Sequence, residues 1–193
     1  TFANKGIYVK PVMVLRIEDK NGTVLYESVP ETLDVISEEA AYVTINLMKG
    51  VTEHGSGARL RHAGLEKENY IYKNIVTGYP YIFENPIAGK TGTTQNQSDG
   101  WFMGIVPNLV TGVWVGGEDR SIHFEEIAYG QGATMALPIW GQFMREIYLR
   151  PELGISSDDF IEPETLTIPL DCDKYIQEQT EEDLEDLDEF GFL

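Results

Sequence analysis

The chain has 193 residues, a formal net charge of −18 and a hydrophobic content of 42%. This length fits one domain with a core of ordinary size, and the strong negative charge argues against nucleic acid or an anionic membrane as a partner. No apolar run reaches the roughly 18 residues of a transmembrane helix, no signal peptide is visible, and the single Cys172 cannot form an internal disulfide.

The first residues predict a helix end followed by a β-hairpin. Residues 1–4 look like the last turn of a helix with Gly6 just past its end, which indicates a segment cut from a longer protein. Residues 7–18 partly alternate between apolar and polar, Asn21-Gly22 is a favoured hairpin turn, and residues 23–26 return as the partner strand.

A helix is predicted over residues 37–53. Ser37 can cap its N-terminus, and Glu38 and Glu39 suit the positive end of the helix dipole. Gly55 ends it, and His54 at that end is interpreted as a surface or structural residue. The apolar stripe expected to enter the core consists of Ala41, Thr44, Ile45, Leu47, Met48 and Val51.

The segment after this helix allows two interpretations. A basic patch follows the turn at residues 55–58 and either contacts an acidic partner or forms a solvated helix face, and the solvated face is favoured. The connector at residues 64–85 is rich in aromatic residues, which either line a cleft or anchor the connector to the body. The patch consists of Arg59, Arg61 and His62, and the aromatic residues are Tyr70, Tyr72, Tyr79, Tyr81 and Phe83.

The stretch at residues 88–94 contains the side chains best suited to bind a substrate. Lys90 is a cation, Thr91 and Thr93 are hydroxyl donors, and Gly92 lets another backbone come close, so the stretch can hold an anionic, peptide-like group beside a strand. A phosphate-binding loop is the competing interpretation. That motif needs a glycine where Glu84 stands, and a helix directly after the threonine, which the following residues do not predict.

An α+β fold is predicted around this stretch, with an antiparallel sheet, flanking helices and the separate hairpin. Residues 87–94, 100–106 and 109–116 read as successive strands, and Ser98-Asp99-Gly100 is interpreted as a turn. Glu125 and Glu126 are interpreted as solvated loop charges. A helix beginning near residues 134–138 is expected to bury Ile139, Trp140, Phe143, Met144 and Ile147.

The domain is expected to span residues 1–150. Residues 151–193 are interpreted as a linker, punctuated by Pro163 and Pro169, and an acidic tail. Residues 178–189 hold eight acids in twelve positions, a density that repels itself and predicts a mobile, solubilising segment.

Five blocks in a fixed order carry a family resemblance: residues 1–11, 53–58, 88–94, 99–104 and 112–116. The series resembles the C-terminal part of the transpeptidase domain of class A (bifunctional) penicillin-binding proteins, over roughly residues 1–147. Lys90-Thr91-Gly92 matches the K-T-G box of these serine acyl-transferases. The resemblance implies a partial fold of the penicillin-binding protein and β-lactamase type, with the C-terminal helix on one face of the sheet.

The resemblance implies a D,D-transpeptidase, which attacks a D-Ala-D-Ala stem peptide with a serine, forms an acyl-enzyme and cross-links peptidoglycan. β-Lactams acylate the same serine. Lys90 would supply positive potential, Thr91 and Thr93 would bind the substrate carboxylate, Gly92 would allow close approach, and the Thr93 backbone N–H would be an oxyanion donor. Lys90 and Thr93 are thus the catalytic candidates, and no cofactor or metal is implied.

The chain departs from the family pattern in one respect. Neither S-x-x-K nor S-x-N occurs anywhere in it, so the nucleophile is expected upstream, in the parent protein, and this fragment alone is expected to be inactive. The alternative is a non-catalytic binding or scaffold module derived from the same fold.

The remaining expectations concern the parent protein. Its partners would be peptidoglycan stem peptides and β-lactams, and a glycosyltransferase domain would accompany it. It would act at the outer face of the cytoplasmic membrane, in the periplasm, anchored by an N-terminal segment missing here. An exposed sheet edge would allow a homodimer.

Overall fold

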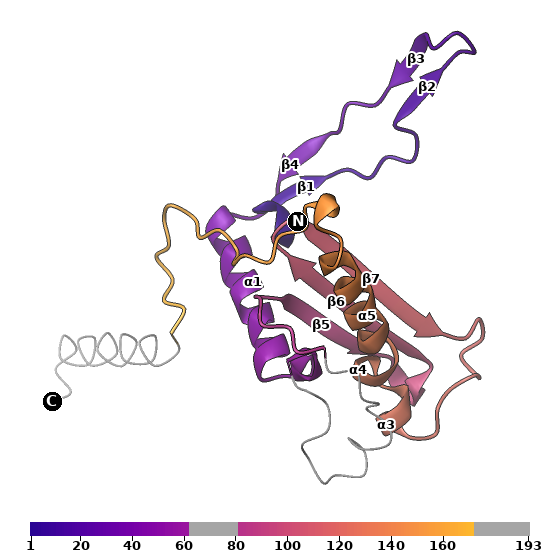
Figure 1. Ribbon diagram of the computed structural model, residues 1–193, viewed down its shortest axis with the longest axis vertical. Helices are drawn as coiled ribbons and strands as arrows, with labels where there is room; N and C mark the ends of the chain where they lie inside the picture. Colours follow the sequence, from indigo (N-terminus) through magenta and orange to yellow (C-terminus); the bar gives the residue numbers. More distant parts are fainter. Residues whose placement is uncertain (62–80, 172–193) are drawn as a thin grey trace, which may run out of the picture.

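The computed structural model describes residues 1–61 and 81–171. It has an α+β body, in which helices cover an antiparallel sheet, and a narrow arm that projects away from the body (Figure 1). Among the described residues, no helix combines the length and apolar character needed to cross a membrane.

The sheet has three strands in the order β5-β6-β7, all antiparallel. They are β5 (Ala88–Thr93), β6 (Asp99–Val106) and β7 (Leu109–Gly116). Lys90 lies opposite Met103, and Trp101 lies opposite Trp114. The three strands predicted from the sequence are confirmed, and β5 contains the whole Lys90–Thr93 stretch.

Helix α1 (Glu38–Glu53) runs beside β5 (Figure 1). The Ser37 side chain caps it by accepting a hydrogen bond from the Ala40 N–H at 3.1 Å, as predicted. Ile45 is buried against Ala88 and Ile105 of the sheet. The predicted stripe is wrong at Leu47, which is 69% exposed, because α1 packs on the sheet around Ala88 and Ile105 over a narrower face than the sequence suggests.

After the sheet, the described residues form helices α3 (Ile127–Gly130), α4 (Gly132–Met135) and α5 (Leu137–Tyr148). The fully buried Trp140 of α5 packs edge-on against Phe102, with ring centroids 5.2 Å apart. This confirms that the C-terminal helix covers one face of the sheet. The predicted buried face was wrong at two positions, since Ile139 and Phe143 are 51% and 45% exposed.

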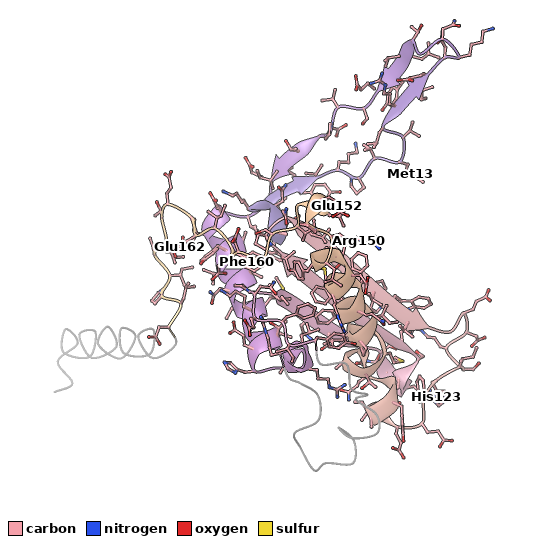
Figure 2. All side chains as sticks on the ribbon, in the orientation of Figure 1. Met13, His123, Arg150, Glu152, Phe160 and Glu162 are labelled. Atoms are coloured by element: carbon pink, nitrogen blue, oxygen red, sulfur yellow. The ribbon has the colours of Figure 1, made fainter. Side chains whose placement is uncertain are left out.

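The arm is longer than the predicted hairpin. Strand β1 (Ile7–Val9) pairs with β4 (Thr32–Asp34), and β2 (Arg16–Glu18) pairs with β3 (Val24–Glu27). Figure 2 shows Met13 projecting from the bend between the two pairs, where its side chain is fully exposed.

Four short 3₁₀ turns also lie within residues 1–61 and 81–171. They are η1 (Phe2–Asn4), η2 (Ala58–Leu60), η3 (Gln95–Gln97) and η4 (Pro151–Leu153). The first of these agrees with the helix end predicted at residues 1–4.

Residues 154–171 return along the body and contact α1. Lys49 forms an ion pair with Asp159 at 2.9 Å, and Phe160 packs beside α1 on the cluster around Ile45 (Figure 2). Glu39 accepts hydrogen bonds from Thr167 and Ile168. The domain boundary at residue 150 stays a prediction, and the acidic tail lies outside the described residues.

Candidate functional site

The outer edge of β5 is where the predicted site residues meet. No other strand in the described ranges pairs with this edge. The Thr94 N–H donates to Asp99 O at 3.1 Å, on the β6 side. Because backbone groups alternate in direction along an antiparallel strand, the N–H and C=O groups of Thr91 and Thr93 point away from β6. Lys90 Nζ lies on this edge, donating to Thr91 O at 2.7 Å.

Both threonine hydroxyls have a partner from another element. Ser56 Oγ lies 2.6 Å from Thr91 Oγ1. The Gly132 N–H donates to Thr93 Oγ1 at 3.0 Å. Since Thr93 accepts this bond, its own hydroxyl proton can go to a second partner. The Lys90 and Thr93 side chains are exposed, so a substrate can reach them.

The approach of α4 to β5 requires glycine. A Cβ on Gly132 would lie 2.3 Å from Gly92 O and 2.4 Å from Trp101 O, both backbone atoms that cannot move aside. A Cβ on Gly92 would lie 3.2 Å from Trp101 Cβ. Gly92 therefore serves packing within the sheet, and the close approach of a substrate expected there stays a prediction. Sequence reasoning missed Gly132, although Gly130-Gln131-Gly132 was a visible glycine cluster.

Asp99 holds the turn that follows β5. Its carboxylate accepts hydrogen bonds from Trp114 Nε1 at 3.1 Å, Ser98 Oγ at 3.0 Å and Thr94 Oγ1 at 3.1 Å. Partial burial works to raise the pKa of Asp99, but these hydrogen bonds outweigh it and hold the pKa below its ordinary value. Ser98 lies in the turn as predicted, whereas Asp99 and Gly100 already belong to β6.

The two described arginines of the basic patch hydrogen-bond to carbonyl and hydroxyl groups of other segments. The prediction of a solvated helix face was therefore wrong. Arg59 Nη1 donates to Ala133 O at 2.8 Å and to Thr134 Oγ1 at 3.0 Å. Arg61 donates to Phe83 O at 2.9 Å, to Asn85 O and to Thr52 Oγ1. Burial lowers the pKa of the Arg61 guanidinium. Carbonyl groups brought close by folding bind these cations, and sequence alone does not reveal such partners. His62 lies outside the described residues.

The described aromatic residues of the connector anchor it to α5. Tyr81 Oη donates to Pro138 O at 2.9 Å, and Phe83 is buried against Trp140 and Tyr148. The other aromatic residues of the connector, Tyr70, Tyr72 and Tyr79, lie outside the described residues.

The remaining polar candidates lie on the surface, as expected from the sequence. His54 is the exposed C-terminal cap of α1, and Glu125 and Glu126 are exposed. Within residues 1–61 and 81–171, no three His, Cys, Asp or Glu side chains lie close enough together to hold a metal ion.

Comparison with known proteins gives a consistent family match. Residues 1–121 match the family described as the penicillin binding protein transpeptidase domain. Penicillin-binding protein 1A of Aquifex aeolicus is 32% identical over 146 residues, which cover 76% of this chain and 17% of that protein. Penicillin-binding protein 1A of Clostridium tetani is 33% identical over 147 residues, covering 76% of this chain and 16% of that protein.

An experimentally solved protein structure has a similar fold. The crystal structure of penicillin-binding protein 1A from Haemophilus influenzae superposes with a TM-score of 0.60 at 20% identity, covering 86% of this chain and 26% of that one. The chain therefore spans about a sixth of the length of the curated relatives it matches.

Proposed function

The chain belongs to the family of penicillin-binding protein transpeptidase domains, and on that premise we propose that it forms the substrate-holding edge of a peptidoglycan D,D-transpeptidase. In this reaction a serine oxygen attacks the carbonyl of a D-Ala-D-Ala stem peptide, the peptide bond breaks, and D-Ala leaves with a proton. An amine of a second peptidoglycan strand then attacks the resulting ester, forms the cross-link and releases the serine.

The observation that carries this proposal is the polar outer edge of β5. It presents the Thr93 N–H, the Thr93 hydroxyl and the Lys90 ammonium on the side away from β6. These groups are donors, so the edge suits an extended peptide that ends in a carboxylate and whose carbonyl oxygen becomes negative during the reaction.

Each residue has a role in this proposal. The Thr91 and Thr93 hydroxyls bind the terminal carboxylate of the stem peptide, and Lys90 adds positive potential beside it. Gly92 keeps the strand surface bare, so that the peptide lies close to the backbone. The Thr93 N–H donates to the oxyanion of the tetrahedral intermediate, a contact whose loss typically costs about a hundred- to a thousandfold in rate.

The nucleophile comes from outside the printed sequence in this proposal. The chain contains neither S-x-x-K nor S-x-N, so residues elsewhere in the parent would supply the serine and its lysine partner. The isolated chain would then neither bind penicillin covalently nor cross-link peptides. The parent would also carry a glycosyltransferase domain, and would act outside the cytoplasm, anchored by an N-terminal membrane segment.

A homodimer is a further part of the proposal. In the described ranges, the outer edge of β7 and the edges of the arm leave unpaired backbone groups that a second copy could bind, while the β5 edge stays open for the substrate.

The test is labelling by a fluorescent penicillin, performed on the full-length parent and on this chain. We expect the parent to be labelled and this chain not. Lys90→Ala should slow labelling of the parent about ten- to a hundredfold, because hydrogen bonds to charged groups contribute about 1.5–3 kcal/mol. Lys20→Ala, which removes an exposed lysine of the arm, is the matched control and should label at the normal rate.

Two outcomes would count against the proposal. Covalent labelling of the isolated chain would place a nucleophile within it. A parent that is never labelled would favour the non-catalytic binding or scaffold module.

A further inference from the structure

Ser56 is a polar residue at the site to which the proposed reaction assigns no role. It lies in the loop after α1, and its Oγ is 2.6 Å from Thr91 Oγ1 on β5, although the two residues are 35 positions apart in the sequence. Ser56 is exposed and Thr91 is half-buried. The pair therefore lies where a substrate on the β5 edge would meet it.

The loop around Ser56 is fixed by its backbone. The Gly55 N–H donates to Gly50 O at 3.1 Å, and the Gly57 N–H donates to Val51 O at 2.8 Å. A Cβ on Gly55 would lie 2.9 Å from Val51 Cα, so the loop folds directly onto the helix end. Ser56 thus lies between two glycines whose N–H groups are hydrogen-bonded to α1. The helix therefore sets the position of the Ser56 hydroxyl.

The hydroxyl of Thr93 is also held by a hydrogen bond from another element. The Gly132 N–H at the start of α4 donates to Thr93 Oγ1 at 3.0 Å. Arg59 joins the segment after α1 to α4 by donating to Ala133 O and Thr134 Oγ1. Both threonine hydroxyls are therefore held by a single hydrogen-bonded assembly, in which Ser56 contributes through its side chain.

We propose that Ser56 is a positioning residue for substrate carboxylate recognition, an inference that rests on the function proposed above. The Ser56 hydroxyl donates to Thr91 Oγ1, which directs the Thr91 proton toward the carboxylate. Hydrogen bonds in such a chain polarise one another, so the bond from Thr91 to the anion is stronger than that of an isolated threonine. Ser56 does not touch the substrate itself.

The test uses the full-length protein and two boronic acids that differ only in a carboxylate group, both of which add reversibly to the active-site serine. In the unmodified protein the carboxylate should improve the inhibition constant. Ser56→Ala should reduce that improvement about three- to tenfold, the usual range for one hydrogen bond. Ser56→Thr, which keeps a hydroxyl, should restore it. Ser157→Ala is the matched control, because Ser157 is an exposed serine in the segment after α5.

A double-mutant cycle shows whether Ser56 acts through Thr91. In a Thr91→Val background, Ser56→Ala should cause less than about a twofold further loss, since the two changes remove the same interaction. Thermal unfolding of each variant confirms that it is folded.

Equal weakening of both boronic acids by Ser56→Ala would show a merely structural role and overturn this inference alone. Failure of the unmodified protein to bind either boronic acid or penicillin would overturn the proposed function and this inference with it.

Discussion

Glycine determines how closely the helices approach the sheet. At Gly104 an added Cβ would lie 2.2–2.5 Å from atoms of the Trp140 indole, which fills the space a side chain would take. Trp140 is fully buried and also donates to Thr111 Oγ1. The indole is therefore fixed both by packing and by its N–H group, and it has no second position to adopt.

The first stability prediction concerns this contact. Gly104→Ala should lower the free energy of unfolding by about 1–3 kcal/mol or more, because overpacking a filled core forces side chains out of their rotamers. Calorimetric unfolding measures the loss. Gly50→Ala is the matched control, since Gly50 lies inside α1 and an added Cβ would meet no atom within 4 Å apart from the adjacent backbone of the helix itself. It should be neutral or stabilising by about 0.5–1 kcal/mol, and an equal loss in both variants would contradict the argument.

The sequence predicted only part of the residues at the site. Lys90, Thr91, Gly92 and Thr93 stand in one run whose chemistry is readable. The Thr91 partner Ser56 and the Thr93 partner Gly132 are 35 and 39 positions away. Such contacts depend on how α1 and α4 pack against the sheet, which no local pattern encodes.

At the scale of elements, α1 is held from two sides, by β5 and by residues 154–171. The carboxylate of Glu39 in its first turn accepts from the backbone and side chain of Thr167 and from the Ile168 N–H at 3.0 Å. The backbone hydrogen bond from Thr167 is the largest effect that lowers the pKa of Glu39. Ionised Glu39 therefore stabilises the docked segment.

A pH dependence follows from this lowered pKa. The stabilisation is present above the unfolded-state pKa of about 4.3 and is lost as the pH falls through the lower folded-state value. Glu39→Ala should speed hydrogen exchange of the Thr167 and Ile168 amides at neutral pH, and the difference from the unmodified protein should shrink in acid. Glu38→Ala is the control, since it removes an acid of the same turn that pairs with Lys5 instead. Equal exchange in both variants would contradict the assignment.

Some elements were predictable and others were not. The strands β5, β6 and β7 and helix α1 carry strong periodic or β-branched patterns. Strand β4 is only three residues long, and its pairing with β1 is set by the hairpin between them. Helix α5 is apolar on most sides, so periodicity could not tell that Trp140 and Met144 face the core while Ile139 and Phe143 do not.

At the scale of the whole molecule, the described residues offer the outer edge of β7 and two further surfaces for association. One is the arm, and the other is the sheet face that carries Trp101, Met103 and Trp114, each 40–47% exposed. If the proposed homodimer forms through the β7 edge or the arm, light scattering of this chain should give twice its mass of 21.7 kDa. A monomeric mass across the accessible concentrations would exclude it.

The contacts around Arg61 have a consequence for the register of β5. The Phe83 N–H donates to Leu60 O at 2.9 Å, and Arg61 binds the carbonyls of Phe83 and Asn85. Residues 60 and 61 are thus joined to residues 83–85 just before β5 begins. Because these contacts position the start of β5, the register of that strand does not depend on the length of the sequence between Arg61 and Phe83.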